Sequence, residues 1–196
     1  MFDKTLLLLI LLIASGCFSG NSDQDGCKAE LHNSFLNIKL GDAIVEVEKA
    51  YPLIYKNQIS PLGDFLYETC NQKKLEVVSF EENNHFKNKI VSVVTRVTKE
   101  AICRDANGAL PDFGVDIVTH EGIRLGMARA DIENTYGRPC VVRSMKDGST
   151  GLIYRSKETV KEINSSTPYY FFHLRDGKIS GITFALDWQN TLSKKK

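Results

Sequence analysis

Two copies of one short motif constrain the fold of this chain more than any other feature of its sequence. The first copy is Ile38–Pro52 and the second is Ile123–Pro139, so the copies start 85 residues apart. Aligned from their isoleucines, the copies share a leucine, a glycine and a tyrosine, which are Leu40, Gly41 and Tyr51 in the first copy and Leu125, Gly126 and Tyr136 in the second. This spacing is too long for a solenoid repeat, so we interpret the copies as a duplicated small unit.

Each copy predicts a short helix that begins after the glycine. Ile44, Val47 and Tyr51 follow one another at positions i, i+3 and i+7, which places them on one face of a helix. Ile132 and Tyr136 repeat part of this pattern in the second copy. Helices of about nine residues are marginally stable in water, so both helices must pack against an apolar surface.

Segments with strand character follow each predicted helix and would supply that surface. They are rich in β-branched and aromatic residues, and they cover residues 65–69, 75–80 and 90–97 in the first half and residues 141–143, 152–155, 169–174 and 179–186 in the second. Asp176-Gly177 predicts a tight hairpin between the last two segments. We therefore predict an α+β fold of two tandem units, residues 35–103 and 120–190, each a short helix or helix pair packed on an antiparallel β-meander. The turn-rich residues 104–119 are predicted to link the units.

The start of the chain predicts an export signal. The apolar run Leu6–Ile13 follows Lys4 and is shorter than a membrane-spanning helix. Ala14-Ser15-Gly16-Cys17 comes next and resembles the lipobox of bacterial lipoproteins, in which the cysteine carries the lipid and begins the mature chain. The resemblance implies a signal peptide at residues 1–16 and lipid attachment at Cys17; the alternative is a plain signal peptide with an incidental cysteine.

The segments at the two ends favour a tethered protein of the cell envelope. Residues 17–34 are rich in small polar residues and predict a flexible tether, and residues 191–196 form a basic tail. Phe18 is not the aspartate that retains lipoproteins in the inner membrane, so by resemblance the outer membrane is favoured, facing the periplasm or the surface. The balance of 25 basic and 24 acidic residues gives a net charge of +1, which offers no electrostatic reason to expect nucleic-acid binding.

Four cysteines remain in the mature chain after Cys17, namely Cys27, Cys70, Cys103 and Cys140. An even number in an exported protein predicts two disulfides, with three possible pairings that the sequence leaves open. A reactive thiol is the alternative. The spacings match no zinc pattern and the four histidines are scattered, so we predict neither a metal site nor a cofactor.

The second motif copy and the hairpin after it carry a family likeness. The pattern Ile-x-Leu-Gly-Met-x-x-x-Asp-Ile-Glu-x-x-Tyr-Gly-x-Pro, followed by Leu-x-Asp-Gly-Lys-Ile-x-Gly-Ile-x-Phe, resembles the repeat of the β-lactamase inhibitor protein (BLIP-like) superfamily. That superfamily includes the SmpA/OmlA-type outer-membrane assembly lipoproteins, which carry a single copy. The resemblance implies helices on one face of an antiparallel sheet and an opposite face that binds other proteins, while no inhibitory residue can be matched in this chain.

The last aromatic strand offers the candidate binding residues. Alternation along residues 169–175 places Tyr170, Phe172 and Leu174 toward the helices and leaves four side chains on the opposite face, namely Tyr169, Phe171, His173 and Arg175. Aromatic residues with an arginine are typical of protein-binding hot spots. The alternative is that another part of the chain covers this face.

No catalytic motif is found in the sequence, so we predict a non-enzymatic, lipid-anchored module that binds another envelope or secreted protein as an assembly accessory or an enzyme inhibitor. The alternative is an envelope enzyme or small-ligand carrier with a pocket between the two repeats.

Overall fold

The computed structural model describes residues 28–51, 55–58, 63–71, 73–83, 86, 89–97, 104–105, 108–109, 114, 116–163 and 166–187. The predicted signal peptide and basic tail, with Cys17, Cys27 and Cys103, lie outside the described residues. In chain order the elements are β1 (Lys28–Ala29), β2 (Ser34–Phe35), β3 (Ile38–Lys39), α2 (Ile44–Ala50), β4 (Tyr55–Gln58), β5 (Phe65–Asn71), β6 (Glu76–Asn83), β7 (Lys89–Val97), β8 (Arg104–Asp105), β9 (Gly108–Ala109), α3 (Arg129–Tyr136), β10 (Val141–Ser144), β11 (Thr150–Ser156), the 3-10 turn η4 (Lys161–Ile163), β12 (Thr167–Arg175) and β13 (Lys178–Asp187).

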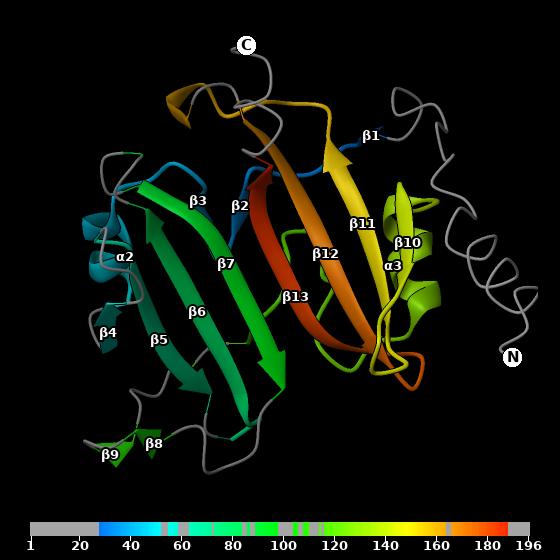
Figure 1. Cartoon of the computed structure of the whole chain (residues 1–196), viewed down its shortest axis with the longest axis horizontal. Helices are drawn as coiled ribbons and strands as arrows, with labels where there is room; N and C mark the ends of the chain where they lie inside the picture. Colours follow the sequence, from blue (N-terminus) through cyan, green and yellow to red (C-terminus); the bar gives the residue numbers. More distant parts are fainter. Residues whose placement is uncertain are drawn as a thin grey trace, which may run out of the picture.

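A single twisted sheet runs through the molecule (Figure 1). Its strand order is β1-β11-β12-β13-β7-β6-β5-β4, and β10 pairs with β11 beside β1. Every pairing is antiparallel except that of β1 with β11.

The prediction of two separate α+β units was wrong, because the fold is mostly β and its sheet is continuous. The last strand of the first half, β7, pairs with the last strand of the second half, β13, through contacts such as Phe184 opposite Val93. An open edge strand presents unpaired backbone groups, and joining the two meanders satisfies both edges. The helices have only 7 and 8 residues, too few to form a layer for each half alone.

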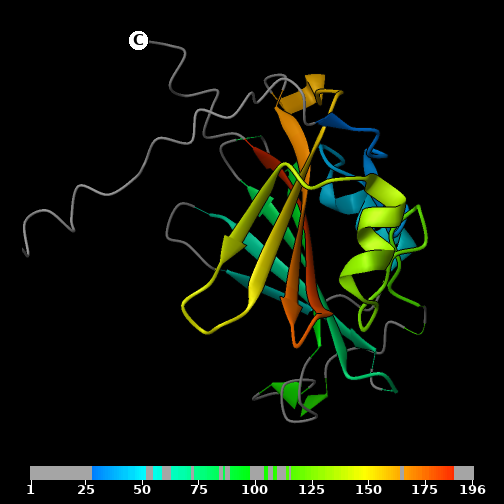
Figure 2. The same cartoon turned by 90° about the vertical axis from the view of Figure 1, so that its right-hand side faces the viewer.

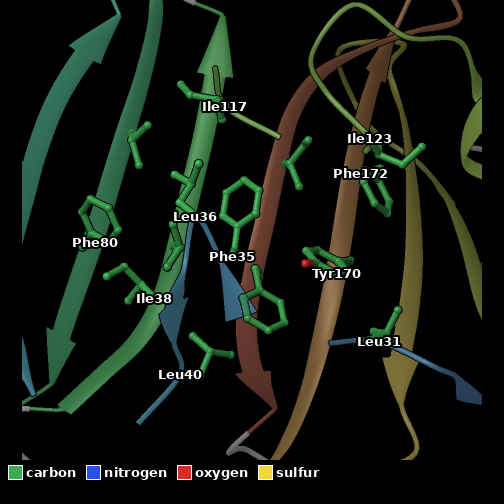
Figure 3. Close-up of a cluster of buried hydrophobic side chains, with 14 of the residues drawn as sticks. Leu31, Phe35, Leu36, Ile38, Leu40, Phe80, Ile117, Ile123, Tyr170 and Phe172 are labelled. Carbon is green, nitrogen blue, oxygen red and sulfur yellow. The ribbon is translucent and has the colours of Figure 1, made fainter. Parts of the chain in front are cut away.

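Both helices and the β2–β3 hairpin pack on one face of this sheet, as the edge-on view shows (Figure 2). Val47 of α2 and Ile132 of α3 are each fully buried against it. Phe35 of the hairpin contacts Tyr170 of β12 edge to face, with ring centroids 6.3 Å apart (Figure 3). One apolar core therefore serves both halves of the chain.

The two motif glycines make matching corners. Gly41 and Gly126 have φ angles of 93° and 84°, a region that favours glycine. The Gly41 amide donates to the carbonyl of Ile90, and the Gly126 amide donates to that of Ile179, each at 2.8 Å. Each corner thus ties the approach to a helix to one of the two central strands, β7 or β13. Leu40 and Leu125 are buried beside these corners.

Part of the predicted tether instead belongs to the folded chain. Lys28 and Ala29 pair with Arg155 and Ser156 at the end of β11, and Leu31 is buried in the core. An apolar side chain that fills the core gives residues 28–34 a fixed course along the sheet. Residues 28–34 of the predicted tether are therefore part of the fold, and residues 17–27 lie outside the described part.

Candidate protein-binding face

The alternation predicted for β12 is confirmed. Tyr170, Phe172 and Leu174 are buried under the helices, at 3% exposure or less. On the opposite face Tyr169, Phe171 and His173 are partly exposed, and Arg175 is exposed. We call these four residues the β12 face.

Residues of the neighbouring strands flank the β12 face, the buried Ile153 and Ala185 among them. The strand register places Ile153 of β11 and Thr183 of β13 on either side of Phe171. It places Arg155 and Ala185 on either side of Tyr169. Burial raises the pKa of Tyr169, and Asp187 adds to this effect, so the phenol stays neutral and able to donate a hydrogen bond.

A glycine leaves room for the Phe171 ring on this face of the sheet. Gly151 lies opposite His173 on β11, and a Cβ atom there would sit 2.4 Å from Cε2 and 2.6 Å from Cζ of Phe171. The ring therefore occupies the space that any other side chain at position 151 would fill. The rings of Phe171 and His173 are nearly parallel, with centroids 6.4 Å apart and planes 17° apart.

Hydroxyl groups fix the His173 ring from both sides. Its Nε2 lies 2.6 Å from Oγ of Ser149, and its Nδ1 lies 3.2 Å from Oγ of Ser180. Ser180 also donates to the His173 carbonyl at 3.1 Å. A side chain held in this way loses little freedom on binding, which lowers the entropic cost of association.

An ion pair at the rim continues this network. Arg175 contacts Asp147 at 3.1 Å, and Asp147 also accepts hydrogen bonds from the Ser149 hydroxyl and amide. The Ser149 hydrogen bonds, with a smaller contribution from Arg175, lower the pKa of Asp147 to about 2. Asp147 is therefore ionised at any physiological pH.

The sequence analysis did not identify Ser149 as a residue of this site, because its contact with His173 depends on the β11–β12 register and no local motif indicates it. The Ser149–His173 distance is within reach of a nucleophile and a general base. Ser149 is only 4% exposed, and its amide is already bonded to Asp147. The network accordingly orients His173.

The far half of the same sheet face combines buried and partly exposed side chains. Cys70, Val77 and Ser79 are each 2% exposed or less. Leu66, Glu68, Glu81 and Val94 are partly exposed on that face, and the exposed Arg96 is paired with Glu68. Cys70 and Cys140 are both disulfide-bonded. They lie at opposite ends of the sheet and so cannot be bonded to each other.

A cavity lies between the end of the first motif copy and the segment that leads into the second. It has a volume of about 330 Å³ and is lined by residues that include Tyr51, Asp116, Thr119 and His120. Asp116 is paired with Lys74 at 2.5 Å, and the Tyr51 hydroxyl donates to the Leu36 carbonyl. Two polar groups of this cavity, the Asp116 carboxylate and the Tyr51 hydroxyl, thus already have partners.

The second motif tyrosine is used in the same structural way. The Tyr136 hydroxyl donates to Glu121 at 2.5 Å and lies 3.1 Å from the Thr119 hydroxyl. Burial, reinforced by Glu121, raises the pKa of Tyr136 far above the usual range. Both motif tyrosines fix the ends of their helices and do not line the β12 face.

The described residues contain no cluster of three or more His, Cys, Asp or Glu side chains arranged to hold a metal ion. They also contain no helix of sufficient length and apolarity to span a membrane.

Comparisons with known proteins place the chain in no family. No family model matches the sequence, and no significant match was found among curated proteins. A cysteine-rich secretory protein from Staphylococcus aureus subsp. aureus Mu50 is similar in structure, with a TM-score of 0.45 and 14% sequence identity over 83% of this chain and 48% of that one. The present chain thus spans about half the length of that protein, and a likeness this weak carries no conclusion about function.

Proposed function

We propose that this protein is a lipid-anchored module of the cell envelope that binds another envelope or secreted protein through the β12 face. The observation that carries the proposal is the state of that face: two aromatic rings and a histidine are partly exposed, Gly151 leaves room for the Phe171 ring, and two serine hydroxyls hold the histidine in place. Aromatic anchors that are fixed before binding are what protein-binding hot spots use.

The proposed anchor is independent of the proposed binding face. It depends on Cys17 and the apolar run before it, which lie outside the described residues. Replacement of Cys17 by Ser is expected to release the protein from membranes into the soluble fraction. Continued membrane association of this variant would refute lipid attachment at Cys17 and leave the β12 face untouched.

Photo-crosslinking tests the binding face directly. A photoreactive amino acid is placed at Tyr169 of the otherwise native, membrane-bound protein, and a matched probe is placed at Val45 on the exposed side of α2, where the side chain is 47% exposed. We expect a discrete crosslinked species from position 169 and none from position 45. Equal labelling at both positions, or at neither, would contradict the proposal.

The competing proposal is a small-ligand carrier that uses the cavity beside Tyr51 and His120. It predicts that bulky substitution of Thr119, which lines the cavity, abolishes function while Phe171→Ala does not. The binding-face proposal predicts the reverse.

A further inference from the structure

We infer that the outer edge of β10 is a second docking site, which binds an extended acidic peptide strand by adding it to the sheet. This inference goes beyond the proposed function, because it concerns a different surface and a different mode of recognition. It rests on the hydrogen-bonding groups, the exposed apolar side chains and the charge of the β10 edge.

The free backbone groups of β10 follow from its register. Its four residues pair with β11 alone among the described strands, and just beyond it the Met145 amide donates to the Ser149 carbonyl at 2.9 Å. In an antiparallel ladder every second residue directs both backbone groups at its partner. Met145 and Arg143 therefore face β11, and the amide and carbonyl groups of Val142 and Ser144 point outward.

The side chains of this edge suit an incoming strand. Val142 and Met145 are 50% and 40% exposed, an unusual state for large apolar residues at a sheet edge. Val142 is paired with the buried Leu152, so its side chain lies on the helix side. There it borders a cavity of about 400 Å³ that is lined by α3 and the turn after it, including Arg129, Glu133 and Pro139. An apolar side chain of an added strand would enter this groove.

The charge along β10 selects an acidic partner. Arg138, Arg143 and Lys146 are exposed and make no ion pair within the part of the chain that the structure describes. The neighbouring acids are already engaged, since Glu133 is paired with Arg129 and Asp147 with Arg175. Three uncompensated positive charges attract acidic side chains and repel a second copy of the same strand.

The test uses synthetic peptides as probes for the full mature protein. An eight-residue peptide that alternates glutamate and valine carries a fluorophore, and its binding is followed by fluorescence anisotropy at low ionic strength. A peptide that alternates lysine and valine is the charge control. We expect the acidic peptide to bind at least about tenfold more tightly than the basic one. Equal affinity for both peptides would overturn the inference.

Two variants at one position separate backbone recognition from side-chain recognition. Val142→Pro removes an amide that points away from β11, so it leaves the β10–β11 ladder intact. Val142→Ala trims the side chain and keeps the amide. We expect the proline variant to bind the acidic peptide at least about tenfold more weakly than the alanine variant. Equal binding by the two variants would show that no strand is added.

A charge exchange covers the case in which the proline variant fails to fold. Arg143→Glu is expected to weaken binding of the acidic peptide and to strengthen binding of the basic one; no change with either peptide would overturn the inference. Phe171→Ala is expected to leave peptide binding unchanged, so failure of the β10 inference is distinct from failure of the proposed β12 face.

Sedimentation of the wild-type protein as a dimer that Val142→Pro converts to a monomer would assign this edge to a second copy of the chain instead.

Discussion

Gly151→Ala is the substitution that separates the packing of the β12 face from the stability of the fold. The added Cβ would lie 2.4 Å and 2.6 Å from two carbons of the Phe171 ring, whereas carbon atoms in contact are normally about 3.5–4.0 Å apart. The ring must therefore move by about 1 Å or more. Because Phe171 is partly exposed, it can swing away from the sheet into solvent.

The cost of this movement to the fold is modest. Overpacking in a core costs about 1–3 kcal/mol, and the partly open position of the ring places this case at the low end. Replacing a strand glycine recovers about 0.5–1 kcal/mol of backbone entropy. We expect a net loss of at most about 1–2 kcal/mol in the free energy of unfolding, or a few degrees in Tm for a chain of this length.

Partner binding should respond much more strongly. The expected loss approaches that of Phe171→Ala, because the anchor ring no longer lies where the partner meets it. Urea denaturation reports the stability, near-ultraviolet circular dichroism reports the ring, and capture of the crosslinked partner reports binding. Gly181→Ala is the control for an added methyl group on the same face, since its Cβ would lie 3.3 Å from the Thr95 carbonyl and 3.6 Å from Cβ of His173, an ordinary contact distance, and would not touch Phe171. Full partner capture by the Gly151→Ala protein would refute the proposed role of the ring.

Three further predictions concern the frame around this face. Peptide mapping of the unreduced protein is expected to find Cys27 joined to Cys140 and Cys70 joined to Cys103. The reason is that Lys28 pairs with Arg155, while the Cys140 amide donates to the Ile153 carbonyl on the same edge of β11. A Cys27–Cys70 peptide would contradict this register. Tyr136→Phe is expected to cost about 1.5–3 kcal/mol of unfolding free energy, because the Tyr136 hydroxyl donates to the Glu121 carboxyl. Tyr51→Phe is expected to cost only about 1 kcal/mol, because the Tyr51 hydroxyl donates to a neutral carbonyl. Equal costs in chemical denaturation would show that the two tyrosines are not used differently. The stability contributed by ionised Asp147 is expected to be complete above the ordinary carboxyl pKa of 3.8 and to be lost as the pH falls through about 2, because the folded pKa is the lower of the two. An Asp147 carboxyl that titrates near pH 4 by NMR would exclude the hydrogen bonds assigned to it.

Local patterns in the sequence were sufficient to predict seven of the strands and the last hairpin, while the short strands β1–β4, β8 and β9 were not predicted. Strands occur at all seven predicted positions, and Asp176 and Gly177 both have positive φ angles in the hairpin between β12 and β13. Alternation along β12 also separated the buried from the partly exposed side chains correctly. These features depend on residues close together in the chain, so composition and spacing determine them.

Long-range pairings were beyond the reach of the same reasoning. The contact of Val93 with Phe184 joins the two halves into one sheet, and nothing local to β7 or β13 indicates it. The fold class was therefore wrong. The ordered course of Lys28 to Leu31 was missed for the same reason, since a polar-looking tether gains its place only from the edge of β11.

The candidate site was predicted in part. Its four exposed residues followed from alternation, but the groups that hold them did not. Gly151 and Ser149 come from another hairpin and meet Phe171 and His173 only through the β11–β12 register. A sequence pattern therefore predicts which side chains share one face of a strand, but it does not predict the contacts that these side chains make with another strand.

Co-purification of the full-length, membrane-bound protein tests the central claim most directly. The wild-type chain is compared with a variant that carries Tyr169→Ala and Phe171→Ala, and with Val45→Ser as a control of similar exposure on the helix side. The binding-face proposal predicts one specific partner that is retained by wild type and by Val45→Ser and is lost from the double variant while its fold is unchanged. Retention of that partner by the folded double variant would contradict it.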